Sequence, residues 1–140
     1  MTDRPDPPPS PLHVPALEGL RVLVVEDHAI GRILLEAMLG GLGVTPTLAA
    51  TGEEARRAIR AGAFDVVLID LGLPDVRGED LAADLGRLAD DHRPRVIAVT
   101  GRERPTVLPA VFADWLEKPF SVRDLHRLLV GLDADIARSA

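Results

Sequence analysis

Cysteine is absent from this chain of 140 residues, which excludes disulfides, thiol nucleophiles and zinc sites built on cysteine. An excess of basic residues is also missing, because 16 Lys and Arg face 22 Asp and Glu and leave a net charge of −6. Such a sequence offers no electrostatic footprint for nucleic acid or anionic lipid. Its apolar runs are too short to cross a membrane, and its N-terminus lacks the apolar segment of a secretory signal. We therefore expect a cytoplasmic protein without a DNA or membrane partner.

Lysine is nearly absent as well. The only lysine among the 16 basic residues is Lys118, which Pro119 follows directly. A compact ammonium on a flexible stem differs from a planar guanidinium. Lys118 therefore marks a position where arginine would not serve, unless its solitary occurrence is chance.

Proline divides the chain into two parts. Six of the 12 prolines lie within residues 1–17 among polar residues, a composition that favours extended, solvated chain. We predict a flexible Pro-rich tail over residues 1–18 and one domain over residues 19–140. The length and the 46% hydrophobic share suffice for one core and exclude a multidomain enzyme.

From residue 20 onward, short apolar runs alternate with amphipathic segments, the pattern of successive βα units around a parallel sheet. The expected strands are 21–25, 44–48, 64–69, 95–99 and 115–117, and the expected helices are 30–42, 52–61, 79–89 and 125–136. Pro105 and Pro109 lie where a further helix should join the fourth and fifth strands. Because proline inside a helix costs about 3 kcal/mol, we expect this fourth helix to be shortened or absent.

Polar residues follow four of the expected strands. Glu26 and Asp27 follow the first, Asp70 the third, Thr100 the fourth and Lys118 the fifth. The carboxyl ends of parallel strands share one edge of a sheet, so these side chains can converge. Three carboxylates repel one another unless a cation joins them, and Mg²⁺ suits such oxygen ligands. A carboxylate can then accept a phosphoryl group, with hydroxyl and ammonium groups contacting its oxygens. Taken singly, each acid could instead cap the following helix.

Four motifs resemble, in the same order, those of response-regulator receiver domains, the CheY-like phosphoryl-accepting modules of two-component signalling. They are Val24–Asp27, Ile69–Pro74 with Gly78, Val99–Gly101 and Trp115–Phe120. The resemblance covers residues 20–132. It implies an α/β fold of the flavodoxin-like class, a doubly wound sheet of five parallel strands in the order 2-1-3-4-5 with helices on both faces.

The resemblance also implies roles for the converging acids. Asp70 would be the phosphoacceptor. Glu26, Asp27 and Asp70 would hold Mg²⁺ together with the backbone carbonyl of Gly72, a position that also tunes the hydrolysis of the acyl phosphate. His28, beside Asp27, is expected to be a surface histidine of the first helical turn rather than part of the site.

Further roles are implied for residues at the ends of the last two strands. Thr100 and Lys118 would contact the phosphoryl group, and Thr100 with Trp115 would form the switch that answers phosphorylation. Trp115 replaces the usual Tyr or Phe, and its alternative role is to fill the core. Arg102 occupies a second position that tunes hydrolysis, which leaves the lifetime of the acyl phosphate open. The bond between Lys118 and Pro119 is often cis in relatives.

For function, the resemblance implies a stand-alone receiver, because no effector domain follows Ala140, and a signalling phosphoacceptor rather than an enzyme. Its partners would be a sensor histidine kinase or a histidine phosphotransfer protein and an unknown downstream protein, and a homodimer stays open. The alternative is a pseudo-receiver, a binding module regulated by a partner or by a small anion held by arginines. A phosphohydrolase of the haloacid-dehalogenase type is disfavoured, since Gly72 stands where that pattern needs Asp.

Overall fold

Five strands and four helices alternate along residues 17–89 and 92–139, the part of the chain that the computed structural model describes. The strands are β1 Val22–Val25, β2 Thr47–Ala49, β3 Val66–Asp70, β4 Arg95–Thr100 and β5 Asp114–Glu117. The helices are α1 Ala29–Gly41, α2 Gly52–Ala61, α3 Gly78–Leu88 and α4 Val122–Ser139. The tail proposed over residues 1–18 lies outside the described residues except for Glu18 and Leu17, which is fully buried.

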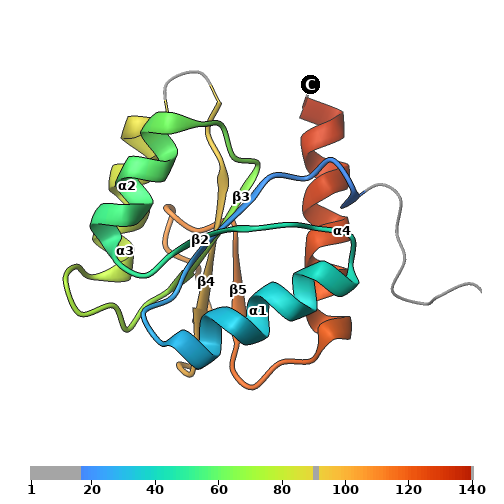
Figure 1. The fold of residues 1–140 in the computed structure, drawn as a ribbon, viewed down its shortest axis with the longest axis horizontal. Helices are drawn as coiled ribbons and strands as arrows, with labels where there is room; N and C mark the ends of the chain where they lie inside the picture. Colours follow the sequence, from blue (N-terminus) through green and yellow to red (C-terminus); the bar gives the residue numbers. More distant parts are fainter. Residues whose placement is uncertain (1–16, 90–91, 140) are drawn as a thin grey trace, which may run out of the picture.

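The strands form one parallel sheet in the order β2-β1-β3-β4-β5. α1 and α4 cover one face of this sheet, and α2 and α3 cover the other (Figure 1). This arrangement confirms the predicted flavodoxin-like architecture. The order reverses between β1 and β3, because β2 lies on one side of β1 and the later strands lie on the other. In open sheets of this kind, ligands bind beside the carboxyl ends of the strands at such a reversal.

Each face of the sheet has its own hydrophobic core, and single strands contribute to both. Every residue of β1 and β3 is buried, and successive side chains point to opposite faces. Leu23 and Val67 therefore face α2 and α3, whereas Val24 and Leu68 face α1 and α4. Helical residues at three- and four-residue spacing complete the cores, with Ala55, Ile59, Leu81 and Leu85 on the first face and Leu35, Leu39, Leu125 and Leu129 on the second.

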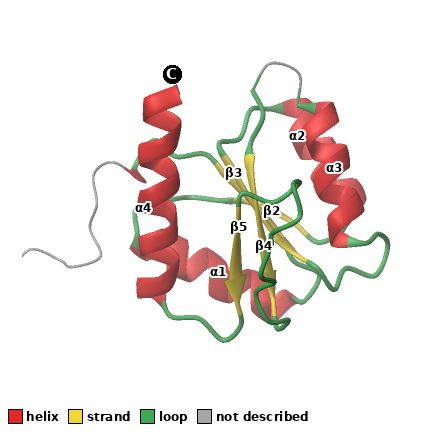
Figure 2. Ribbon diagram, turned by 180° about the vertical axis from the view of Figure 1, so that it is seen from behind, coloured by secondary structure: helices red, strands yellow, loops and turns green. Residues whose placement is uncertain are grey.

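No helix forms within residues 101–113, between β4 and β5, as Pro105 and Pro109 predict. The label α4 therefore belongs to the helix that follows β5. Phe112 takes over part of the covering role of the missing helix, because it is 5% exposed and meets the ring of Trp115 edge to face at 6.0 Å. Figure 2 shows this connection as a loop beside β4 and β5.

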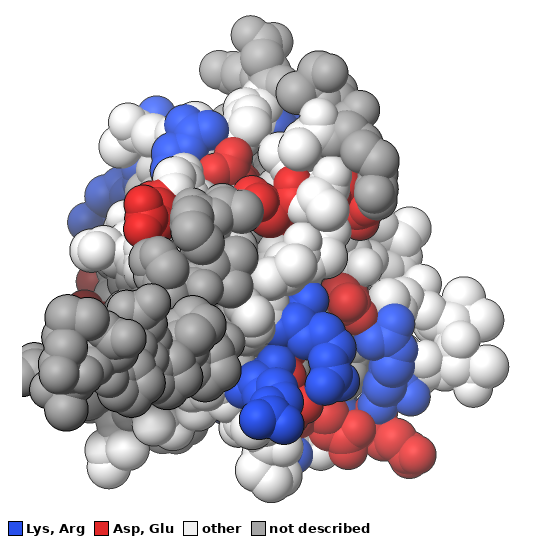
Figure 3. Space-filling model, turned by 90° about the vertical axis from the view of Figure 1, so that its right-hand side faces the viewer, with Lys and Arg blue, Asp and Glu red and all other residues white. Residues whose placement is uncertain are grey.

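The surface of the described residues carries charge of both signs and an apolar cluster. On the side where α4 lies, basic and acidic side chains occur in neighbouring groups (Figure 3). The apolar cluster lies on α1, where Ile30, Ile33 and Leu34 are exposed. Among the described residues, no helix is both long and apolar enough to span a membrane.

A polar cluster around Asp65 joins the amino ends of β1, β3 and β4. The Asp65 carboxylate accepts hydrogen bonds from the Arg21 backbone N–H at 2.9 Å and from the Arg21 guanidinium at 3.2 Å, and His92 Nε2 lies 2.9 Å from it. Burial on its own would raise the pKa of Asp65. The hydrogen bonds from Arg21 and His92 and the charge of Arg21 outweigh burial and hold that pKa below its usual 3.8.

Asp65→Asn is expected to lower the free energy of unfolding at neutral pH by about 2 kcal/mol, because it weakens charge-assisted hydrogen bonds to a buried carboxylate. Since the folded pKa lies below 3.8, this stabilisation is complete above that pH and is lost as the pH falls through the folded pKa. Urea unfolding of both proteins, from neutral pH down through this range, measures the difference. A difference that stays constant with pH would contradict the assignment.

Candidate functional site

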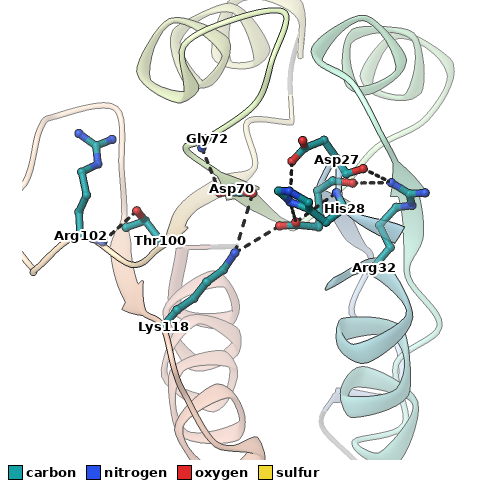
Figure 4. Close-up of polar contacts among 9 residues, drawn as sticks. Asp27, His28, Arg32, Asp70, Gly72, Thr100, Arg102 and Lys118 are labelled. Carbon is teal, nitrogen blue, oxygen red and sulfur yellow. Dashed lines mark hydrogen bonds and ion pairs between the residues drawn. The ribbon is translucent and has the colours of Figure 1, made fainter. Parts of the chain in front are cut away.

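Three carboxylates meet at the carboxyl ends of β1 and β3. Glu26 and Asp27 follow β1 directly, and Asp70 is the last residue of β3. These three side chains and His28 each offer a ligand atom, and the four atoms lie within 4.8 Å of one another. Glu26 is 2% exposed and Asp70 is 8% exposed, so two of the three acids are buried. Figure 4 shows Asp70 and Asp27 on the same side of the site.

The electrostatics of this cluster fit a divalent cation. The pKa of Glu26 is raised, mainly by burial and further by the hydrogen bond with Asp70 and the negative charge of Asp70. The charge of Lys118 and the hydrogen bond with His28 act in the opposite direction and offset part of this rise. A buried oxygen, Asp27 Oδ1, has no hydrogen-bond partner among the described residues. A hard cation bound to these oxygens would relieve the repulsion and satisfy the unpartnered atom, and carboxylate oxygens are the ligands that Mg²⁺ prefers. The residues present therefore fit Mg²⁺.

Lys118 reaches this cluster from the end of β5. Its Nζ lies 3.5 Å from Glu26 Oε2 and 3.8 Å from Asp70 Oδ2 (Figure 4). Its backbone N–H donates to the carbonyl of Thr100 at 2.7 Å, and its bond to Pro119 is cis. The one lysine of the chain thus places its ammonium against two carboxylates from two other strands.

Thr100 and Trp115 are connected through Arg102. The Arg102 backbone N–H donates to Thr100 Oγ1 at 3.1 Å, and the Trp115 indole N–H donates to the Arg102 carbonyl at 3.0 Å. The Arg102 guanidinium lies 5.9 Å from the centre of the indole and pairs with Glu79 at 3.3 Å, and in Figure 4 it points away from Asp70. Trp115 is 9% exposed, so it fills the core and is also bonded to the loop that carries Thr100.

The loop after β3 holds Asp70 from the other side. The Gly72 backbone N–H donates to Asp70 Oδ1 at 3.0 Å. The role of the Gly72 carbonyl as a metal ligand stays a prediction. Gly78 allows the loop to close onto α3, because a Cβ at this position would lie 2.9 Å from Leu71 Cα. The glycine in this motif is therefore a requirement of close packing.

Two residues of the site, Arg32 and Gly31, escaped the sequence analysis, and a third, His28, was expected to lie outside the site. Arg32 donates from one guanidinium nitrogen to the carbonyls of Glu26 and Asp27, both at 2.9 Å, and so fixes the backbone of the acidic loop. Gly31 leaves room for Glu26, since a Cβ there would lie 2.9 Å from its Oε1. His28 is a surface residue as expected, with 74% of its side chain exposed, but its Nδ1 lies at the acids. A glycine or an arginine within a helix carries no signal of such a role in the sequence, and His28, the N-cap residue of α1, is marked only by its place beside Asp27.

Comparison with known proteins decides the family. The model of the response regulator receiver domain matches residues 22–130. The chain belongs to the response regulator receiver family. Its receiver fold is shared with a CheY-like receiver domain from Methylobacillus flagellatus, which is 29% identical with a TM-score of 0.75 and matches 81% of this chain and 98% of that one.

Two further relatives occur within sensor proteins. The receiver domain of a sensor histidine kinase from Pseudomonas aeruginosa, solved with magnesium in its active-site cleft, is 28% identical with a TM-score of 0.71, covering 82% of this chain and 98% of that one. The aerobic respiration control sensor protein ArcB of Escherichia coli is 33% identical over 117 residues, 81% of this chain. This receiver spans only 15% of the length of ArcB.

In this receiver, Gly31→Ala is expected to weaken Mg²⁺ binding about tenfold, because the added methyl displaces the buried Glu26 carboxylate. The same change raises helix propensity by about 1 kcal/mol, so the loss of binding should not follow a loss of stability. Calorimetric titration with Mg²⁺ and urea unfolding measure the two quantities. Gly40→Ala is the matched control in the same helix, since a Cβ there meets nothing within 4 Å. Equal Mg²⁺ affinities in the two variants would contradict the assignment.

Proposed function

We propose that this chain accepts a phosphoryl group on Asp70 and acts as a signalling switch, passing its output on by protein contact. One observation supports the proposal above all: the Asp70 carboxylate lies among Glu26, Asp27 and Lys118, with Lys118 Nζ at 3.8 Å. The acids suit a divalent cation, and the ammonium suits a phosphoryl oxygen. Asp70 thus has the partners that an aspartyl phosphate requires.

In the proposed step, an oxygen of Asp70 attacks the phosphorus of the donor. The bond between phosphorus and the donor's histidine nitrogen breaks, and its electron pair stays on that nitrogen. Glu26, Asp27 and Asp70 hold Mg²⁺, with the Gly72 carbonyl as a further ligand. Bound Mg²⁺ supplies the positive charge that lets phosphoryl oxygens approach three carboxylates. The magnesium in the cleft of the Pseudomonas receiver supports this choice of cation.

Lys118 and Thr100 are proposed to contact the oxygens of the phosphoryl group once it is on Asp70. In the structure, Lys118 Nζ is engaged by Glu26 at 3.5 Å, and Thr100 Oγ1 accepts the Arg102 N–H. A phosphoryl group on Asp70 adds negative charge that competes for the ammonium and for the hydroxyl proton. Because Trp115 donates to the carbonyl of Arg102, a shift of Thr100 reaches the indole and biases a two-state equilibrium of this loop.

The phosphoryl donor, a sensor histidine kinase or a histidine phosphotransfer protein, is proposed to dock on α1. Ile30, Ile33 and Leu34 form an apolar surface, the α1 patch, in which the three residues are 81%, 66% and 54% exposed. The patch adjoins a groove of about 390 Å³, mostly apolar, whose lining includes Leu34 itself together with Glu26 and Lys118. Exposed apolar patches of this kind mark interaction sites. A donor seated there brings its histidine to the mouth of the acidic site.

The test is the intact mass of the full chain after incubation with acetyl phosphate, with and without Mg²⁺. We expect one phosphoryl adduct in the presence of Mg²⁺ and none in its absence. No adduct in either condition, even at short times with excess donor, would instead favour the pseudo-receiver. Two arginines that could hold an anion in that alternative are already paired with acids, Arg102 with Glu79 and Arg104 with Asp114.

A further inference from the structure

We propose that His28 is a ligand of the ion in the acidic site, so that this site selects first-row transition ions over Mg²⁺ more strongly than its carboxylates alone would. The inference rests on the proposed function, because it concerns the same cation site. It assigns to the Nδ1 atom of His28 a place beside the oxygens of Glu26, Asp27 and Asp70.

The spacing of the donor atoms supports this assignment. His28 Nδ1 lies 3.1 Å from Glu26 Oε1 and 3.2 Å from Asp27 Oδ1. Neighbouring donors around an octahedral ion with bonds of about 2.1 Å lie about 3 Å apart. The nitrogen and the two oxygens are therefore already spaced as adjacent ligands of one ion.

The position of His28 in the fold leaves its ring available. His28 is the N-cap residue of α1, a place that usually carries Ser, Thr, Asp or Asn, and its side chain makes no capping hydrogen bond. The ring turns to the acids instead and lies among them in Figure 4. Arg32 holds the carbonyls of Glu26 and Asp27, so the loop that carries the histidine is fixed.

The unpartnered oxygen of Asp27 points to the same ligand. Asp27 Oδ1 is buried and accepts no hydrogen bond from the described residues, and its contact with His28 Nδ1 at 3.2 Å is an ion pair only when the imidazole is protonated. An ion between them would satisfy both the oxygen and the nitrogen lone pair. Without an ion, His28 Nδ1 is hydrogen-bonded to Glu26 Oε1 at 3.1 Å. Binding an ion therefore requires Nδ1 to release its proton to solvent, with the remaining ring proton on Nε2.

The chemistry of the added donor determines which ions benefit. Mg²⁺ prefers oxygen ligands, whereas imidazole nitrogen suits nickel, zinc and other late first-row ions. A site of three carboxylates and one imidazole therefore gains affinity for Ni²⁺ from the nitrogen and gains little for Mg²⁺. His28 thereby makes the receiver sensitive to which divalent ion is available.

The test is calorimetric titration of the full chain with Ni²⁺ and with Mg²⁺, comparing the wild type with His28→Gln. We expect the Ni²⁺ affinity of His28→Gln to fall by at least about tenfold, and the Mg²⁺ affinity to change by less than about threefold. His13→Gln, at a histidine outside the described residues, is the matched control and should bind both ions as the wild type does. Zinc titration followed by ¹⁵N NMR of the imidazoles adds a direct readout, a shift of His28 Nδ1.

The outcomes separate the inference from the proposed function. If the wild type takes up a phosphoryl group and binds Mg²⁺, but His28→Gln binds Ni²⁺ unchanged, only the role of His28 is wrong. If His13→Gln loses Ni²⁺ affinity and His28→Gln does not, the Ni²⁺ site lies elsewhere and the inference is overturned. If the wild type binds neither ion and forms no phosphoryl adduct, the inference and the proposed function both fail.

Discussion

Asp70→Asn is expected to carry no phosphoryl adduct under conditions that label the wild type. An amide lacks the anionic oxygen that attacks phosphorus, and the change also removes one of the three carboxylates of the cation site. The amide oxygen can still accept the Gly72 N–H, which the carboxylate accepts at 3.0 Å, so the loop after β3 should keep its shape. Intact mass after incubation with acetyl phosphate and Mg²⁺ measures the result.

Asp80→Asn is the matched control for this experiment, because Asp80 is an exposed aspartate in the first turn of α3. This variant should be labelled as the wild type is. An adduct that persists on Asp70→Asn would place the acceptor on another residue and overturn the proposed function. Equal unfolding transitions of the two variants would establish that a loss of labelling is not a loss of fold.

Ile33→Asp is expected to slow phosphoryl transfer from a protein donor about thirtyfold, because a charge at the centre of a docking surface costs about 2 kcal/mol of binding. Labelling by acetyl phosphate should stay as in the wild type, since a small donor needs no docking surface. Ile33 is 66% exposed, so the substitution leaves the core intact. The measurement compares the two donors, with a histidine kinase chosen because it labels the wild type.

Val107→Asp places the same charge on another exposed apolar residue, 80% exposed in the connection between β4 and β5. It should leave transfer from the kinase unchanged. If both variants slow transfer equally, the effect comes from net charge rather than from the α1 patch. If neither variant does, the donor docks elsewhere on the receiver.

The central strands of this sheet are predictable from the sequence because a strand buried on both faces shows no alternation, as in β1 and β3. β2 is less so. Val44 resembles a strand residue and is 1% exposed, but β2 begins only at Thr47, because Pro46 lacks the N–H that strand pairing needs. The burial of Val44 depends on how the chain leaves α1 and packs, which its local sequence does not encode.

The same distinction holds for the site. The sequence predicts that Glu26, Asp70 and Lys118 lie close together, because the carboxyl ends of parallel strands share one edge of the sheet. The contributions of Gly31 and Arg32 cannot be predicted from the sequence, because they depend on how closely the first turns of α1 approach the acidic loop. The need for glycine at position 31 is explained only by the short distance to the Glu26 side chain, and the hydrophobic periodicity of the sequence does not reveal that distance.

Trp115 has a consequence for spectroscopy. It is the only tryptophan of a chain that has no tyrosine, so ultraviolet emission of the protein comes essentially from one indole. That indole donates to the Arg102 carbonyl and meets Phe112 edge to face, so its emission depends on the connection between β4 and β5. The unlabelled chain therefore contains a single fluorophore bonded to the loop that carries Thr100, and a change at the acidic site that moves this loop alters the light it emits.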